Sequence, residues 1–251
     1  IREGEIDSAG LEGQGAIVHL AGENIAGRWT EEKKAQILES RVKGAELLMN
    51  ALTGLKSKPG VVIAASGVGY YGDRGDEVLT EESPQGKGFL AHVSGRWESA
   101  LDIGKGAGIR VVKLRIGMVL STEGGALKQM LIPFKLGIAG RIGSGKQYWS
   151  WISMEDITEG ICFLLETKDA DWPVNMVSPD TVTNEEFTKA LASALNRPAF
   201  IPLPELAARA VFGEMADELL LSSTRAVPVK LTELGYNFRS PVLAKTLRKI
   251  L

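Results

Sequence analysis

A serine and two tyrosines that follow an apolar run are the residues of this chain best suited to proton chemistry. They are Ser66, Tyr70 and Tyr71 in the segment AASGVGYYGD, residues 64–73. Ser66 comes just beyond the predicted end of a strand, and ligands of open parallel sheets bind outside the carboxyl ends of the strands. Hydroxyl groups in that place can polarise a carbonyl or exchange a proton with a substrate. Taken alone, the pattern also fits a tight turn whose tyrosines cap a core.

The elements that must position this segment alternate between strands and helices. Short apolar runs predict strands over residues 16–21, 61–65, 109–114 and 174–177. Apolar residues at helical spacing predict helices over residues 30–53, 89–105, 126–136 and 155–167. Thr30 is a suitable N-cap for the first helix, and Pro133 predicts a kink or an early end in the third. This alternation is typical of a doubly wound α/β fold, a parallel sheet with helices on both faces.

The character of the chain changes after residue 177. Thr183 and Glu186 match a capping box, and further helices are predicted across residues 204–223 and 241–251. We therefore expect residues 1–177 to form the α/β domain and residues 178–251 to form a smaller, mainly helical lobe.

The segment of residues 137–153 is too rich in glycine for a helix and too aromatic for a solvated linker. We expect it to cover the site with a set of polar and aromatic side chains, namely Lys146, Gln147, Tyr148, Trp149 and Trp151.

No phosphate-binding turn precedes the first predicted strand. A dinucleotide site normally begins with a strand, a Gly-x-Gly-x-x-Gly turn and a helix, because free N–H groups at the helix N-terminus hold the pyrophosphate. Gly10, Gly13 and Gly15 follow no apolar strand and precede a strand rather than a helix, so they do not fit this unit. We therefore expect the chain to be an N-terminally incomplete version of its protein.

Composition argues against several classes of protein. A net charge of −2 argues against a general nucleic-acid binder, and no apolar run approaches the roughly 20 residues of a membrane-spanning helix. His19 and His92 form no metal-ligand set with a nearby cysteine or histidine. Cys162 is the single cysteine, which excludes an internal disulfide and favours the cytoplasm, or the stroma or matrix of an organelle. We expect its thiol to pack in a core.

Five segments together resemble the extended short-chain dehydrogenase/reductase superfamily. In chain order they are VHLAGEN, AASGVGYYGD, KLRIGMVLSTEGGAL, IGSGKQYWSWISMEDI and VNMVSP. The chain is most similar to the epimerase-like branch, whose members are described as nucleoside-diphosphate-sugar epimerases or as cell-division-inhibitor-like proteins. The resemblance implies a Rossmann-type domain that binds NADP(H) and a small C-terminal lobe that closes over a small carbonyl or sugar-nucleotide substrate.

The resemblance also assigns residues to the cofactor. Leu20, Ala21 and Gly22 would lie against it after their strand. Gln36 and Arg41 would approach it from the following helix, and Val119 would line its nicotinamide end. Without the resemblance, Arg41 would be a solvated helix residue.

The catalytic pattern of the superfamily is altered in this chain. Its hydride-transferring members carry a Tyr-x-x-x-Lys pair, and Leu90 and Ser94 occupy the two positions here. The substrate-polarising serine of the family aligns with Gly67, unless a shift of one residue in the loop restores Ser66. Tyr70 and Tyr71 are the candidates to replace the tyrosine of the family's pair as the acid, because both follow the end of the strand.

The leading hypothesis is an NADP(H)-dependent oxidoreductase or epimerase-like enzyme with a rearranged acid/base set. The alternative is a catalytically silent dinucleotide-binding sensor or interaction protein, and an inert fragment is the third interpretation. The expected partner is a small molecule. The family also permits a homodimer through residues 30–53 and 89–105, although such helices equally pack against a sheet.

Overall fold

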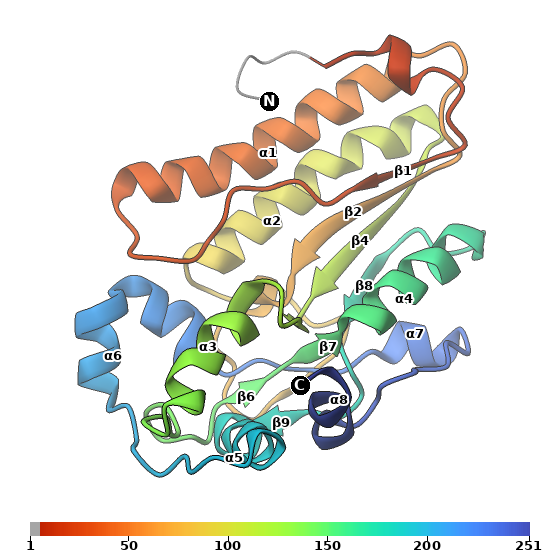
Figure 1. Cartoon of the computed structure of the whole chain (residues 1–251). Coiled ribbons are helices and arrows are strands. Elements are labelled where there is room, and N and C mark those ends of the chain that lie inside the picture. Colours follow the sequence, from red (N-terminus) through yellow and green to blue (C-terminus); the bar gives the residue numbers. More distant parts are fainter. Residues whose placement is uncertain (1–5) are drawn as a thin grey trace.

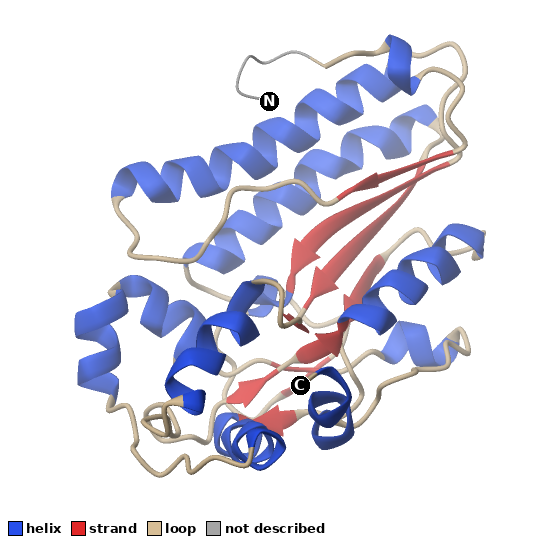
Figure 2. Ribbon diagram, viewed as in Figure 1, coloured by secondary structure: helices blue, strands red, loops and turns tan. Residues whose placement is uncertain are grey.

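The structure is a computed structural model that describes residues 6–251, and its centre is a parallel sheet between two layers of helices (Figure 1). Four strands lie in the order β1-β2-β4-β8: β1 (Ala16–His19), β2 (Val61–Gly67), β4 (Arg110–Ile116) and β8 (Pro173–Met176). All three pairings are parallel. The predicted doubly wound sheet of Rossmann type is therefore confirmed, and Figure 2 shows its strands between the helices.

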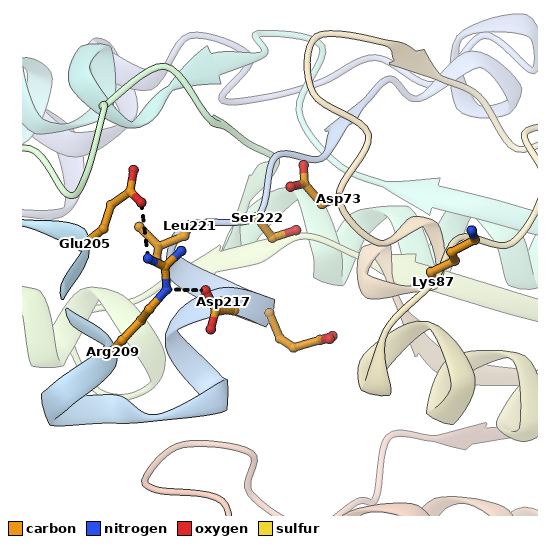
Figure 3. Close-up of a pocket in the computed structure, with 8 residues that line it drawn as sticks. Asp73, Lys87, Glu205, Arg209, Asp217, Leu221 and Ser222 are labelled. Atoms are coloured by element: carbon orange, nitrogen blue, oxygen red, sulfur yellow. Dashed lines mark hydrogen bonds and ion pairs between the residues drawn. The ribbon is translucent and has the colours of Figure 1, made fainter.

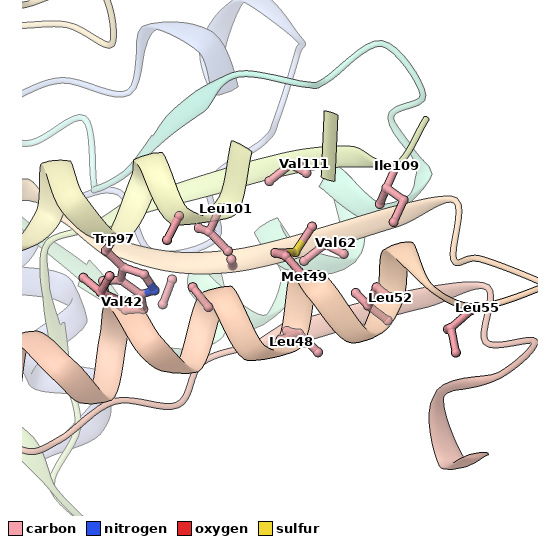
Figure 4. Packing of buried hydrophobic residues seen from close by; sticks show 14 residues of the cluster. Val42, Leu48, Met49, Leu52, Leu55, Val62, Trp97, Leu101, Ile109 and Val111 are labelled. Carbon is pink, nitrogen blue, oxygen red and sulfur yellow. The ribbon is translucent and has the colours of Figure 1, made fainter. Parts of the chain in front are cut away.

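Two long helices cover one face of the sheet. They are α1 (Glu31–Thr53), which begins where the Thr30 hydroxyl accepts a hydrogen bond from the N–H of Lys33, and α2 (Phe89–Leu101). Their apolar stripes point inward, as predicted, and pack against each other and against Val62 of β2 (Figure 4). The outward face of α1 is largely charged, so the homodimer through these helices stays a prediction.

Helix α4 (Met154–Glu166) covers the opposite face of the sheet. Its residues Ile157 and Leu164 pack against Ile63 of β2 and against neighbouring strand residues. The prediction that Cys162 packs in a core is wrong, because its side chain is exposed. The reason is helical geometry: Cys162 comes two residues after the buried Gly160 and therefore lies on the other side of the helix.

A second hydrophobic cluster lies beyond the carboxyl ends of the strands of the central sheet (Figure 1). Helices α3 (Gly125–Lys135), α5 (Asn184–Leu195) and α8 (Leu243–Ile250) surround Trp149 and Trp151. The predicted capping box at the start of α5 is confirmed, because Thr183 and Glu186 each bond the backbone N–H of the other. This cluster takes residues from both sides of position 177, and the division of the chain at that residue stays a prediction.

Among residues 6–251, three pairs of short strands lie outside the central sheet, and two of them join residues on either side of position 177. β5 (Met118–Leu120) pairs with β7 (Trp151–Ser153), β6 (Tyr148–Trp149) with β9 (Val182–Thr183), and β3 (Val78–Leu79) with β10 (Arg225–Ala226). The remaining helices are α6 (Glu205–Phe212), a π-helical turn (Ala216–Leu220) and α7 (Val229–Glu233), together with 3₁₀ turns at Ala9–Leu11, Val68–Tyr71 and Asp102–Ala107. Helix α3 continues through Pro133 to Lys135, so Pro133 does not end it.

Candidate functional site

Ser66 lies within strand β2 and not beyond its end. The strand runs to Gly67, two residues further than predicted, because its backbone pairs with β4 up to Ile116. The Ser66 side chain is 6% exposed, and its hydroxyl donates a hydrogen bond of 2.8 Å to Oε1 of Glu98 in α2. Ser66 is therefore part of the interior of the domain.

A buried ion pair organises the site beside Ser66. Nε and Nη2 of Arg115, in β4, donate to the two carboxylate oxygens of Glu98, each at 2.9 Å. Their side chains are only 3% and 8% exposed. Burial opposes the charge of Arg115, yet the hydrogen bonds and the charge of Glu98 outweigh it, so the pKa of the guanidinium is raised above its ordinary value. Two elements, β4 and α2, are thereby joined by a buried ion pair.

The same guanidinium holds Tyr71 in place. Nη1 of Arg115 donates to the Tyr71 hydroxyl at 3.0 Å, and this hydroxyl donates to Oδ1 of Asn175 at 2.6 Å. The Tyr71 ring is completely buried. Burial raises the pKa of Tyr71 to about 12, so its hydroxyl stays protonated at pH values where an exposed tyrosine would ionise. Tyr71 has no free access to a substrate.

Glu81 closes this network on the side of β8. One of its carboxylate oxygens accepts hydrogen bonds of 3.1 Å from the backbone N–H groups of Asn175 and Lys230. Burial raises the pKa of this carboxyl. The network therefore connects β2, β4 and β8 near their carboxyl ends.

Tyr70 differs from its neighbour in the same 3₁₀ turn, Val68–Tyr71. Its ring is partly exposed and lies against the guanidinium of Arg115, with Cζ 3.5 Å from the ring centroid. Within residues 6–251, its hydroxyl forms no hydrogen bond. Of the three predicted hydroxyl groups, that of Tyr70 is the one left available for another molecule.

Four of the predicted cofactor residues meet at the end of β1. Leu20, Ala21 and Gly22 are exposed in the loop after the strand. Arg41 of α1 reaches behind this loop, where its Nη1 donates to the carbonyl oxygens of Glu23 at 3.0 Å and Ile37 at 3.2 Å. A Cβ atom at Gly22 would lie 3.2 Å from Cζ of Arg41. The absence of a side chain at Gly22 therefore leaves room for the guanidinium.

The other two predicted cofactor residues lie apart from this group. Gln36 is exposed on α1 and donates to Glu32 in the preceding turn at 3.5 Å. Val119 is half-buried in β5, where it pairs with Ile152 and packs against the core on the α4 side of the sheet. The structure does not bring either residue into contact with the loop after β1.

The covering segment is part of the second core. Trp149 and Trp151 are buried, and Gln147 donates to the carbonyl oxygens of Ile142 and Leu220. Tyr148 is half-buried beneath Arg225. Of the five side chains predicted to cover the site, Lys146 alone is exposed.

A cavity of about 420 Å³ lies between the start of α2 and the segment that contains α6 and the π-helical turn (Figure 3). It is lined by Asp73, Lys87, Glu205, Arg209, Asp217, Glu218, Leu221 and Ser222. Glu218 accepts hydrogen bonds of 3.0 Å from the N–H groups of Phe89 and Leu90. Leu90 occupies the tyrosine position of the resembled family, so this cavity adjoins the place where the family's acid would lie.

Leu90 and Ser94 offer no replacement for the Tyr/Lys pair. They are 8% and 6% exposed and lie on the buried face of α2. An aliphatic side chain cannot exchange a proton, and a buried serine carries no positive charge.

Two kinds of site are absent from the described part of the chain. Residues 6–251 contain no group of three or more histidine, cysteine, aspartate or glutamate side chains that is able to hold a metal ion. None of the helices in this range combines the length and the apolar character needed to cross a membrane.

Sequence reasoning missed Arg115, Glu98 and Asn175 as members of the site. A usable signal was present, because a charged residue within the apolar run VVKLRI of a central strand must have a partner when it is buried. The partner itself was not predictable, since Glu98 precedes Arg115 by 17 residues and belongs to a different element.

Comparison with known families gives two matches. The profile of the NAD dependent epimerase/dehydratase family matches residues 5–177, and a domain of unknown function, DUF1731, matches residues 203–250.

Similar proteins occur in bacteria and animals. Epimerase family protein MT2273 of Mycobacterium tuberculosis is 41% identical over 245 residues, which cover 97% of this chain and 81% of that protein. Epimerase family protein SDR39U1 of Homo sapiens is 36% identical over 250 residues, which cover 98% of this chain and 85% of that protein.

Two solved structures are also similar. Human SDR39U1, crystallised with NADPH, has a TM-score of 0.90 at 36% identity, over 94% of this chain and 81% of that chain. The nucleoside-diphosphate sugar epimerase of Corynebacterium glutamicum has a TM-score of 0.79 at 33% identity, over 98% of this chain and 48% of that chain.

Proposed function

Because this chain belongs to the NAD dependent epimerase/dehydratase family, we propose that it binds NADP(H) at the carboxyl ends of β1 and β2. This membership confirms the resemblance to the epimerase-like branch. The similar human protein was crystallised with NADPH. The observation in this chain that carries the proposal is the position of Arg41 directly behind Gly22, at the end of the edge strand.

The residues at the end of β1 fit the phosphorylated cofactor. Gly22 lets a ligand approach the backbone closely, and the exposed side chain of Leu20 offers an apolar contact. Arg41 uses Nη1 for two backbone carbonyls. Its Nη2 forms no hydrogen bond among residues 6–251 and is free to donate to the 2'-phosphate of NADP(H).

We propose further that the chain acts as an oxidoreductase or epimerase-like enzyme on a small carbonyl or sugar-nucleotide substrate. NADP(H) supplies or accepts the hydride when it is bound. Tyr70 is the proposed proton donor, because its hydroxyl is free and its ring is held by Arg115. Ser66 and Tyr71 donate to Glu98 and Asn175, so we assign them to positioning.

A dinucleotide-binding sensor is the second candidate function. The observation that favours it is the buried leucine and serine at positions 90 and 94, which replace both members of the family's proton-transfer pair. This protein would bind NADP(H) without turning over a substrate.

Two measurements test these functions in turn. NADPH is titrated into the purified chain and its fluorescence is followed; we expect a signal that saturates. A signal that does not saturate would contradict cofactor binding. Oxidation of NADPH is then screened against aldehydes, ketones and sugar nucleotides, and turnover supports the enzyme, whereas binding without any turnover supports the sensor.

A further inference from the structure

The charges around the cavity between α2 and α6 determine which ligands it accepts. Its lining contains four carboxylates, from Asp73, Glu205, Asp217 and Glu218, but only two cations, from Lys87 and Arg209. A cleft lined by an excess of one charge repels ligands of the same charge. The diphosphate of a sugar nucleotide carries two negative charges.

Two of the three guanidinium nitrogens of Arg209 are occupied by carboxylates of the protein itself. Its Nε donates to Asp217 at 2.8 Å and its Nη1 donates to Glu205 at 3.3 Å. Figure 3 shows the guanidinium between these two carboxylates. An arginine that recognises phosphate does so through paired N–H donors. Here Asp217 and Glu205 occupy Nε and Nη1 and offset the charge of the guanidinium, so that Nη2 is the one nitrogen without a partner among residues 6–251.

The N-terminus of α2 is also occupied. The first N–H groups of a helix attract anions, and those of Phe89 and Leu90 point toward the cavity lining. Each donates at 3.0 Å to one carboxylate oxygen of Glu218. A Cβ atom at Gly88 would lie 2.4 Å from Oε1 of Glu218, so the glycine makes room for this internal anion.

Lys87 is the remaining cation of the lining. Among residues 6–251 it forms no ion pair. The carboxylate of Asp73 lines the same cavity and offsets its charge. One exposed lysine opposite an aspartate does not form a diphosphate site.

We infer that this cavity takes a small carbonyl substrate whose groups are uncharged or positively charged, and that it excludes nucleoside diphosphate sugars. The inference rests on the proposed function, because the cavity is a substrate site only if the chain binds NADP(H) beside it. It selects the small carbonyl over the sugar nucleotide as the substrate class.

The test is calorimetric titration of the NADPH-saturated chain with UDP-glucose. A double variant, Glu205→Gln with Asp217→Asn, releases Arg209 and removes two negative charges from the cavity. A matched control, Glu123→Gln with Glu166→Gln, removes two exposed carboxylates that do not line it. Circular dichroism confirms that each variant is folded.

We expect the original chain and the control to bind UDP-glucose with a Kd above about 1 mM, and the double variant to bind it at least about tenfold more tightly. UDP-glucose binding to the original chain with a Kd below about 100 µM would overturn the inference, even if the variant did not fold. A folded double variant whose affinity for UDP-glucose equals that of the original chain would also overturn the inference. The NADPH titration is separate, so absence of NADPH binding identifies failure of the proposed function instead.

Discussion

The guanidinium carbon of Arg115 lies 3.5 Å from the centroid of the Tyr70 ring, while its nitrogens bond the carboxylate of Glu98. The contact joins three elements: the central strand β4, helix α2 and the turn that follows β2. The bonds to Glu98 restrict the rotamers of Arg115, so the Tyr70 ring that stacks on its guanidinium keeps one orientation in the turn after β2. The ion pair therefore affects both the stability of the domain and the geometry of its proposed proton donor.

The first prediction concerns the partner of this buried cation. Glu98→Gln leaves Arg115 without a negative charge in the interior, and we expect the free energy of unfolding to fall by about 3–5 kcal/mol. Urea denaturation measures this change. Glu39→Gln is the control, because Glu39 pairs with Lys43 on the surface of α1, and its loss is expected to lower stability by less than about 0.5 kcal/mol. Equal effects of the two substitutions would refute the structural role of the buried pair.

The second prediction concerns alkaline stability. The Tyr71 pKa is raised by burial to about 12, whereas an unfolded tyrosine has a pKa of about 10. Between these values the unfolded chain loses a proton that the folded chain keeps. The free energy of unfolding should therefore decrease as the pH rises through this range, by roughly 2–3 kcal/mol in total from Tyr71.

Denaturation at about pH 8 and about pH 11 measures this slope, since the two values bracket an unperturbed phenol. We expect Tyr71→Phe to reduce the slope and not to remove it, because the pKa of Tyr236 is raised as well. The same slope in the variant would show that the Tyr71 hydroxyl is not buried as described.

Most of the fold was predictable because its signals are local. The four strands of the central sheet and the capping box at Thr183 and Glu186 follow from apolar runs and from residues a few positions apart. Helical spacing likewise predicted the buried stripe of α2. The prediction that Cys162 is buried was wrong, because helix α4 buries only one of its faces and Cys162 lies on the exposed face.

The site was less predictable because its contacts join distant residues. Ser66 meets Glu98 across 32 positions, and Tyr71 meets Asn175 across 104. The sequence marks each of these residues as polar within an apolar context, but it does not identify the partner. The sequence therefore did not distinguish the hydroxyl groups of Ser66, Tyr70 and Tyr71, although two of them form buried hydrogen bonds in the structure.

The third prediction concerns the turn that holds the two tyrosines. A Cβ atom at Gly86 would lie 1.8 Å from the carbonyl oxygen of Tyr71, and a backbone atom cannot rotate away. We expect Gly86→Ala to lower the free energy of unfolding by more than about 3 kcal/mol. Gly106→Ala is the control, because nothing lies within 4 Å of its Cβ position. Thermal unfolding compares them, and a Gly86 variant as stable as the control would contradict the packing of this turn.

The fourth prediction concerns cofactor choice. If Arg41 binds the 2'-phosphate, Arg41→Ala should lower the affinity for NADPH by about 10- to 100-fold, as the loss of a charged hydrogen bond implies. The affinity for NADH should fall much less. Fluorescence titration of both cofactors measures this difference. Lys43→Ala removes a charge from the exposed face of the same helix and should affect neither cofactor. An equal loss for both cofactors would assign Arg41 to support of the loop through Glu23 and Ile37.

The last prediction separates the three hydroxyl groups of the site. The Tyr70 hydroxyl alone is free for a substrate, so Tyr70→Phe should lower turnover by roughly 10²- to 10⁴-fold, the usual contribution of a general acid or base. The affinity for NADPH should not change. Tyr71→Phe and Ser66→Ala should instead reduce stability by about 1–3 kcal/mol, because each removes a buried hydrogen bond. Steady-state kinetics and urea denaturation of all three variants give the two readouts. Full turnover by the Tyr70 variant, or a stable Tyr71 variant that has lost turnover, would move the proton-donating role away from Tyr70.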